Sequence, residues 1–297
     1  MRILLTGASG QVGNALQPLL RRRHTVIAPT SSEFDLSKPD KLGALLDRIR
    51  PDLIINPAAY TAVDRAEDEP ARAMLINGEG PGALARWAAP RQVPIVHLST
   101  DYVFDGRGDR AWREDDPTGP QSAYGRSKLA GEHAVRNAGG AHLVVRTAWV
   151  YAALGNNFMR TMIRLASERE VLRVVADQCG APTSARTIAA TLAEIIGRHE
   201  AGLAAAFARA NGIVHLTNSG DTSWHGFASA IVKGLQSRKV ALKVFEIVPI
   251  ASKDYVAKAM RPANSRLDLA RLKDAYGIEP PAWESALAVE LDAVISL

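Results

Sequence analysis

The sequence predicts an α/β protein with a Rossmann-like, doubly wound parallel sheet and a smaller C-terminal lobe. In the first half of the chain, runs of isoleucine, leucine and valine alternate with helical patterns. Uninterrupted apolar runs of this kind are typical of parallel strands that are covered on both faces. A glycine-rich turn lies between the first strand and the first helix, as in nucleotide-binding sheets. After residue 150 the alternation loosens and helical patterns dominate.

The first half of the chain supplies most of the sheet. Its opening segment predicts a short buried strand, the glycine turn and an amphipathic helix, and further apolar runs and helical patterns then follow in turn. We expect strands at 2–5, 25–29, 51–59, 94–100 and 141–151, and helices at 11–23, 40–50 and 70–90.

The second half contains fewer strand patterns. It predicts strands at 172–177 and 212–219, and helices at 157–170 and 184–199. No internal repeat, low-complexity segment or obvious linker interrupts it. We therefore expect residues 1–150, with return segments after 150, to form the sheet domain, and residues 151–297 to form mainly the smaller lobe.

Composition excludes several classes of protein. The 297 residues are 47% hydrophobic, yet no apolar run approaches the roughly 20 residues of a membrane span. After Met1 and Arg2 the chain enters a strand pattern without the zones of a signal peptide, so we expect a cytoplasmic protein. The single cysteine, Cys179, excludes an internal disulfide or a cysteine-based metal cluster.

The charge balance points away from nucleic acid. The net charge is +5, but the basic residues form no concentrated stripe apart from the short run at 21–23, which fits a solvated helix end. A mild positive excess suits a small anionic substrate such as a nucleotide. We expect neither nucleic acid nor a membrane as a partner.

The glycine turn is the first functional signal. Gly7, Gly10 and Gly13 follow a strand and open a helix, so backbone N–H groups at the helix N-terminus can approach a pyrophosphate. Their spacing is Gly-x-x-Gly-x-x-Gly. The alternative is that these glycines only permit a tight turn, but the position at the start of a βαβ unit favours dinucleotide binding.

A tyrosine and a lysine form the second signal. Tyr124 and Lys128 lie four residues apart in SAYGRSKLAGE, so on a helix they share one face. An exposed pair on a helix surface is the alternative. Thr100 ends the strand at 94–100, and ligands of open α/β sheets bind at the carboxyl ends of strands.

Several motifs together resemble a known family. TGASGQVG, followed about 110 residues later by YGRSK, is similar to the extended short-chain dehydrogenase/reductase family. The runs STDYVFDG, YGRSKLAGE, RTAWVY, GNNF, QCGAPT and RPANSRLD resemble the dTDP-4-dehydrorhamnose reductases within it. The resemblance implies an NAD(P)H-dependent enzyme that reduces the 4-keto group of dTDP-4-dehydro-L-rhamnose to dTDP-L-rhamnose, the last step in making the activated sugar.

The resemblance assigns three catalytic residues. Tyr124 would donate the proton to the developing alkoxide, and the Lys128 ammonium would favour the ionised phenol and bind the nicotinamide ribose. Thr100 would donate a hydrogen bond to the ketone. The triplet Thr100, Asp101, Tyr102 lacks the glutamate of the related nucleotide-sugar 4,6-dehydratases, which favours simple reduction over dehydration.

The resemblance also assigns the cofactor site. The implied cofactor-binding residues are Gly7, Gly10, Gln11, Val12, Gly13, Asp35, Leu36, Ala59, Tyr60, Thr61, Tyr124 and Lys128. Residues 28–31, after the second strand, contain neither an acid for an NAD ribose nor a clear arginine for a 2′-phosphate. We expect NADPH, with NADH as the alternative.

The implied substrate-binding residues lie further along the chain. They are Thr100, Asp101, Trp149, Asn157 and Arg261. Arg261 would pair with a diphosphate oxygen of the dTDP-linked deoxysugar, or else form a surface salt bridge. Asn157 would contact substrate, or else cap the helix that follows it.

Metal and assembly are less defined. The seven histidines show no metal-ligand spacing. Some members of the family use Mg²⁺ in dimer contacts through a glutamate just after the glycine turn, and this chain has Ala15 there, so we assign no metal site and leave Mg²⁺ and a homodimer open. The alternatives in function are a regulatory subunit of the methionine adenosyltransferase type, and a reductase or epimerase for another nucleotide sugar.

Overall fold

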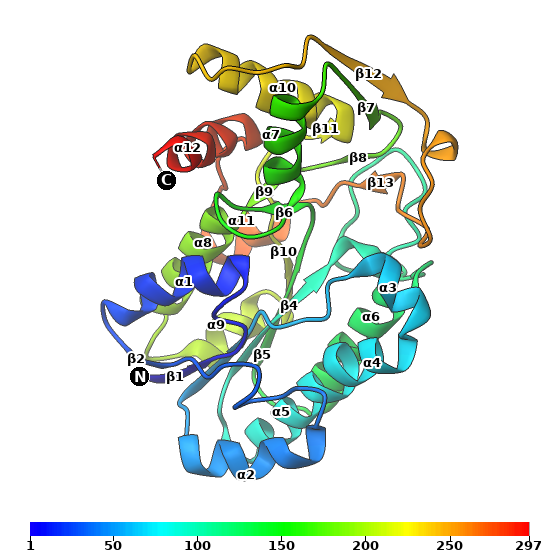
Figure 1. The fold of residues 1–297 in the computed structure, drawn as a ribbon. Coiled ribbons are helices and arrows are strands. Elements are labelled where there is room, and N and C mark those ends of the chain that lie inside the picture. Colours follow the sequence, from blue (N-terminus) through cyan, green and yellow to red (C-terminus); the bar gives the residue numbers. More distant parts are fainter. Residues whose placement is uncertain (297) are drawn as a thin grey trace.

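A six-stranded parallel sheet forms the centre of the molecule (Figure 1), seen in a computed structural model that describes residues 1–296. The strand order is β10-β5-β4-β3-β1-β2, and every neighbouring pair is parallel. The predicted doubly wound α/β class is confirmed. The strands are β1 (Arg2–Leu5), β2 (Thr25–Ile27), β3 (Leu53–Asn56), β4 (Ile95–Thr100), β5 (His142–Thr147) and β10 (Ile213–His215).

Alternate side chains of the strands are buried in two separate cores, because successive side chains of a β-strand point to opposite faces of the sheet. Ile3 and Leu5 belong to one core and Leu4, between them, to the other. The first core lies under α1 (Gln11–Arg21), α8 (Ala185–Arg198), α9 (Leu203–Arg209) and α11 (Ala270–Tyr276). The second lies under α2 (Pro39–Ile49), α5 (Gly80–Ala88) and α6 (Ala123–Asn137).

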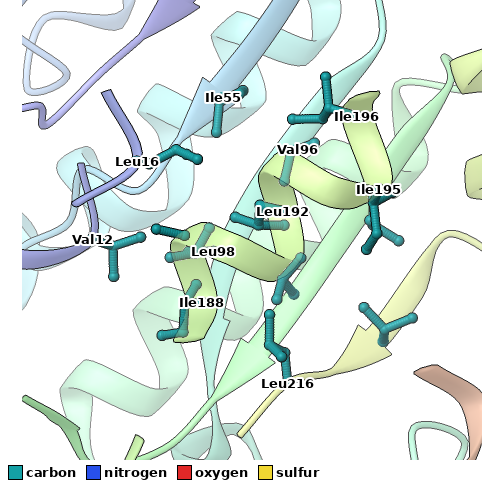
Figure 2. Close-up of a cluster of buried hydrophobic side chains, with 14 of the residues drawn as sticks. Val12, Leu16, Ile55, Val96, Leu98, Ile188, Leu192, Ile195, Ile196 and Leu216 are labelled. Atoms are coloured by element: carbon teal, nitrogen blue, oxygen red, sulfur yellow. The ribbon is translucent and has the colours of Figure 1, made fainter. Parts of the chain in front are cut away.

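Helix α8 makes the largest contribution to the first core. Figure 2 shows Ile188, Leu192 and Ile195 of α8 beside Val96 and Leu98 of β4. These side chains recur at the three- and four-residue spacing of one helix face. A segment from the second half of the chain therefore covers strands from the first half.

The helical region predicted at 70–90 is not one regular helix. It consists of α4 (Pro70–Met74), a π-helical segment (Leu75–Glu79), α5 and a 3₁₀ turn (Ala89–Arg91). A π-helical segment places one extra residue in a turn and often occurs at functional sites. The irregularity brings Asn77 into the interior, where it is fully buried.

The smaller lobe is built around a third core, which contains Tyr151, Phe227 and Trp283. Its helices are α7 (Phe158–Glu168), α10 (Trp224–Ser237) and α12 (Trp283–Ile295). Its strands form small separate sheets, namely β7 (Val171–Val175) with β12 (Glu246–Ile250), β6 (Val150–Tyr151) with β9 (Thr183–Ser184), and β8 (Cys179–Gly180) between β11 (Thr222–Ser223) and β13 (Asn264–Ser265).

One strand expectation needs correction. The strand expected at 141–151 breaks after Thr147, because Trp149 has a left-handed backbone with a φ of 51°, and β6 then pairs with β9 outside the central sheet. The strands expected at 172–177 and 212–219 are present as β7, which lies outside the central sheet, and β10, which lies within it. Across residues 1–296, no helix combines the length and apolarity needed to cross a membrane.

The turn between β1 and α1 leaves room for glycine only. Gly7 has a φ of +57°, and a Cβ added to Gly13 would lie 2.2 Å from the Gly7 carbonyl oxygen. Because that oxygen also accepts a hydrogen bond from the Gly10 N–H at 2.9 Å, it cannot move freely. The turn and the first turn of α1 therefore pack as one rigid unit.

This packing predicts that Gly13→Ala lowers the free energy of unfolding by about 1–3 kcal/mol, the range of a strained, overpacked site. Gly43→Ala is the matched control, since Gly43 lies inside α2 with nothing within 4 Å of the added carbon. It should be neutral or stabilise by up to about 1 kcal/mol, because alanine is the better helix former. Urea denaturation of both variants measures the difference, and equal effects would contradict the close packing of the turn.

Candidate active site

The carboxyl ends of the central strands meet along one edge of the sheet because all the strands run in the same direction. Gly7 follows β1, Pro57 follows β3, Thr100 ends β4 and Ala148 follows β5. This edge is where open α/β sheets bind ligands. It collects most of the predicted site residues.

Helix α6 carries Tyr124 and Lys128 to this edge. The Ser122 hydroxyl caps the helix by accepting a hydrogen bond from the Gly125 N–H at 3.1 Å. A Cβ on Gly125 would lie 2.3 Å from the Tyr102 carbonyl oxygen, so only glycine allows the helix to approach so closely. The Tyr124 and Tyr102 rings then meet edge to face, with centroids 5.5 Å apart.

Thr100 lies beside this pair and is buried. Its hydroxyl donates to the Asp101 carboxylate at 3.0 Å and accepts a hydrogen bond from the Tyr102 N–H at 3.3 Å. Burial raises the pKa of Asp101 to about 6, while hydrogen bonds with Ser265 and Thr100 act in the opposite direction. The structure therefore brings Thr100, Asp101 and Tyr124 together, as the sequence predicts.

Burial has the largest effect on the electrostatics of Tyr124. Burial raises the pKa of the Tyr124 phenol to about 12, although a hydrogen bond with Thr100 lowers it in part. Lys128 is not among the groups that shift this pKa. The expected stabilisation of the ionised phenol by Lys128 stays a prediction, and at neutral pH the phenol of the protein alone keeps its proton.

Lys128 lies one helical turn after Tyr124 on α6 and is only 2% exposed. Its ammonium donates to the Leu98 carbonyl oxygen at 2.5 Å. Burial lowers the pKa of Lys128 to about 8, because a charge in an apolar interior is poorly solvated, whereas the Glu132 carboxylate raises it. An ammonium has three donors, so two remain for a ligand.

A buried ion pair fixes α6 against the sheet. The Glu132 carboxylate accepts hydrogen bonds from Nε and Nη2 of Arg146 at 2.9 and 2.7 Å, and both side chains are almost fully buried. The Ser99 hydroxyl donates to the same carboxylate at 2.5 Å. Sequence reasoning missed this pair, because nothing in the local pattern links positions 132 and 146.

Asn77 is a second residue that sequence reasoning missed. Its side-chain Oδ1 accepts a hydrogen bond from the Tyr60 N–H at 2.8 Å. Its side-chain Nδ2 donates to the Tyr60 carbonyl oxygen at 3.0 Å and to the Ser127 hydroxyl at 2.9 Å. It thus joins the loop after β3 to α6. A polar amide within the apolar helical pattern at 70–90 was the available signal.

The start of α1 fits an anionic cofactor group. Gly10 is the N-cap, no side chain caps the helix, and no acidic residue lies in the first turn. The first-turn N–H groups therefore lack a side-chain acceptor and can donate hydrogen bonds to the oxygens of a pyrophosphate. Val12 turns its side chain into the core and Gly13 packs on Gly7, so both can contribute backbone only.

The other predicted cofactor residues lie in two loops. Ala59, Tyr60 and Thr61 follow β3, where Asn77 holds the backbone of Tyr60. Asp35 accepts from the Ser37 N–H and hydroxyl, and these bonds, together with Lys38, lower the pKa of Asp35 to about 2. Leu36 is buried in the second core, so its side chain is turned away from solvent.

Two predicted substrate residues have clear structural partners. Asn157 caps α7 by accepting from the Arg160 N–H at 3.1 Å, and its amide donates to the Gln11 side chain at 3.0 Å. Trp149 stacks on Trp224, with ring centroids 3.6 Å apart. The left-handed backbone of Trp149 is unusual for a bulky residue, and such strain clusters at functional sites.

Arg261 pairs with an aspartate. Its Nη1 and Nη2 donate to the two carboxylate oxygens of Asp64 at 3.0 and 2.7 Å, and Asp64 is the second residue of α3 (Val63–Asp68). The predicted alternative of a salt bridge is therefore present in the protein alone. Within residues 1–296, no group of three or more histidine, cysteine, aspartate or glutamate side chains could hold a metal ion.

Comparison with known proteins gives consistent matches over the whole chain. The profile of the RmlD substrate binding domain family matches residues 1–295. The sequence is 48% identical over 293 residues to a dTDP-4-dehydrorhamnose reductase of Burkholderia thailandensis, with 97% of each chain covered.

Solved structures agree with these sequence matches. A dTDP-4-dehydrorhamnose reductase from Clostridium acetobutylicum superimposes with a TM-score of 0.90 at 34% identity, covering 99% of this chain and 100% of that one. A dTDP-4-dehydrorhamnose reductase from Bacillus anthracis, solved in complex with NADP, gives a TM-score of 0.87 at 33% identity, covering 98% of this chain and 99% of that one.

The buried ammonium predicts a specific pH dependence of stability. Lys128 loses its proton near pH 8 when folded and near its ordinary pKa of 10.5 when unfolded, so between these values the unfolded chain binds one more proton. Relative to Lys128→Met, the wild-type protein should gain about 2–3 kcal/mol of stability as pH rises through this window. Urea denaturation of both proteins across the window tests this, and a difference that does not change with pH would contradict it.

Proposed function

The chain belongs to the RmlD substrate binding domain family, and from this membership we infer that it is an NAD(P)H-dependent oxidoreductase that reduces dTDP-4-dehydro-L-rhamnose to dTDP-L-rhamnose. The observation that carries the inference is the meeting of Tyr124 and Lys128 of α6 with Thr100 of β4, at the edge of the sheet where the glycine turn opens α1. The alternative of a regulatory subunit receives no support from the relatives, which are named as reductases.

The side chains divide the work of the reduction. A bound nicotinamide supplies the hydride to the ketone carbon. We propose that Thr100 donates a hydrogen bond to the ketone oxygen and that Tyr124, which is protonated at neutral pH, delivers the proton as the alkoxide develops. Lys128 keeps one ammonium hydrogen on Leu98 and would use the others to hold the cofactor ribose.

For the cofactor we propose NADPH as the preferred form, with NADH as a second substrate. The carboxylate of Glu33, in the loop between β2 and α2, accepts hydrogen bonds from the Thr30 N–H and hydroxyl, both at 2.8 Å. It is therefore engaged within its own turn instead of standing ready for a ribose hydroxyl. The NADP-bound relative from Bacillus anthracis supports the same choice.

For the substrate we propose that the dTDP-sugar lies between the sheet edge and the smaller lobe. Residues 1–150, with the return segments that form α8 and β10, would bind the dinucleotide, and residues 151–297 would supply mainly the substrate lobe. Asp101, Trp149 and Arg261 would face the sugar and the diphosphate, and Asn157 would act mainly by ordering the loop beside Gln11. We place the reaction in the cytoplasm and propose neither a metal nor a defined oligomer.

The direct test is an assay with the nucleotide-linked sugar. Purified protein with NADPH and dTDP-4-dehydro-L-rhamnose should oxidise the cofactor, and the free deoxysugar should react far more slowly, because charged hydrogen bonds to the diphosphate are stronger than neutral ones to hydroxyls. Absorbance of the reduced nicotinamide follows the reaction. A folded protein that binds NADPH and NADH but consumes neither with the nucleotide-linked sugar would overturn the proposal.

Tyr124→Phe tests the proton donor. The variant loses only the phenolic hydroxyl, so turnover should fall by roughly 100-fold or more, while NADPH binding by fluorescence titration should remain. Tyr102→Phe is the matched control, because it makes the same change in the neighbouring ring. Near-normal turnover of Tyr124→Phe, or an equal loss in Tyr102→Phe, would remove Tyr124 from this role.

A further inference from the structure

Arg261 and Asp64 form an ion pair between distant parts of the chain. The planar guanidinium donates to both carboxylate oxygens at 3.0 and 2.7 Å, across 197 positions of sequence. This fork-to-fork arrangement is the strong form of a charged hydrogen bond. The Arg261 side chain is 24% exposed and that of Asp64 48%, so the pair lies at a surface that a solute can reach.

Asp64 also holds the backbone of the segment before Arg261. Its Oδ1 accepts from the N–H groups of Ala259 and Lys258 at 3.0 and 3.2 Å. The Lys258 ammonium pairs with Asp68, one turn further along α3. Two aspartates of α3 thus fasten residues 258–261 of the smaller lobe to the sheet domain.

The guanidinium acts on Tyr102, the neighbour of Tyr124. Its positive charge lowers the pKa of Tyr102, although burial, the largest influence, raises that pKa, and the Tyr102 ring touches Tyr124 edge to face. The chain just after Arg261 is anchored, since the Asn264 N–H donates to the Gly106 carbonyl oxygen at 2.9 Å. The backbone on both sides of Arg261 is therefore held in place, by Asp64 before it and by Gly106 after it.

A carboxylate and a phosphate offer the same two-oxygen face to a guanidinium, but a diphosphate brings more negative charge. Hydrogen bonds from Arg261 lower the pKa of Asp64 to about 2, so the carboxylate stays ionised at every physiological pH. A ligand that uses the fork of Arg261 must compete with this carboxylate. A neutral sugar has no means of doing so.

We propose that Asp64 holds the place of a substrate phosphate on Arg261, and that a nucleoside diphosphate displaces this carboxylate when it binds. Asp64 then sets the strength of binding at Arg261: it weakens binding of every ligand that needs this guanidinium and does not affect ligands that make no contact with it. The inference rests on the proposed function, because it takes the dTDP-sugar as the ligand of Arg261.

Asp64→Asn separates charge from structure. Asparagine keeps an oxygen for the N–H groups of Lys258 and Ala259 but removes the negative charge that competes for Arg261. Calorimetric titration with dTDP, in the presence of saturating NADPH, should show binding roughly threefold to tenfold tighter than in the wild-type protein, the scale of a partly exposed charged pair. Thymidine, which lacks the diphosphate, should bind both proteins equally.

Two further variants show whether the gain in affinity arises at Arg261 itself. Asp68 pairs with Lys258 and not with Arg261, so Asp68→Asn removes an equal charge from the same helix without freeing Arg261. If a general gain in positive potential caused the effect, dTDP would bind more tightly to this variant too. We expect it to leave dTDP affinity within about twofold of the wild-type value, as usual for a surface pair. In an Arg261→Gln background, which should itself bind dTDP more weakly, Asp64→Asn should lose its effect.

Unchanged or weaker dTDP binding by Asp64→Asn, with its melting temperature preserved, would overturn the inference, and so would an equal gain in Asp68→Asn. These outcomes are separate from the fate of the proposed reaction. Turnover of dTDP-4-dehydro-L-rhamnose by the wild-type protein, together with unchanged dTDP affinity in Asp64→Asn, would support the proposed function and reject the role of Asp64. Tighter dTDP binding without turnover would keep the nucleotide site and reject the reductase.

Discussion

The buried contact between Glu132 and Arg146 determines where the reactive side chains stand. Glu132 lies one helical turn beyond Lys128 on α6, and Arg146 lies on β5. Ser99 of β4, which donates to the same carboxylate, is the register partner of Arg146, and the next pair in the register is Thr100 with Thr147. The ion pair thus fixes α6, which carries Tyr124, against β5. Through Ser99 the same carboxylate also fixes α6 against β4, the strand that ends in Thr100.

This arrangement joins stability to function. Removing one partner of a buried ion pair strongly destabilises the folded protein, because the other charge then remains without solvent or counterion. The charge of Lys128 depends on the same carboxylate. Burial lowers the pKa of Lys128, and the negative charge of Glu132 raises it. Asn77 adds a neutral link from α6 to the loop after β3, so the catalytic helix is held by a charged contact on one side and an amide contact on the other.

Local sequence patterns predicted the parts of the molecule that depend on neighbours in sequence. The apolar strands, the glycine turn and the helix spacing of Tyr124 and Lys128 are all written in short windows. Partners distant in sequence were not predictable in this way: nothing near Arg261 indicates Asp64, and nothing near Glu132 indicates Arg146. The break at Trp149 was missed because β-branched and aromatic residues on both sides favour a continuous strand, whereas packing against Trp224 accompanies a turned backbone. The raised pKa of Tyr124 follows from burial, which sequence spacing does not report.

The sixth strand of the central sheet comes from residues 213–215, well after the other five. During synthesis, β5 therefore waits with one unpaired edge while about 65 further residues emerge from the ribosome, several seconds at the usual rate of translation. An unpaired edge strand is a template for joining another chain. The return of the late segment that carries α8, α9 and β10 closes that edge and covers the apolar face beside it, so the nascent chain is most exposed to aggregation just before the segment arrives.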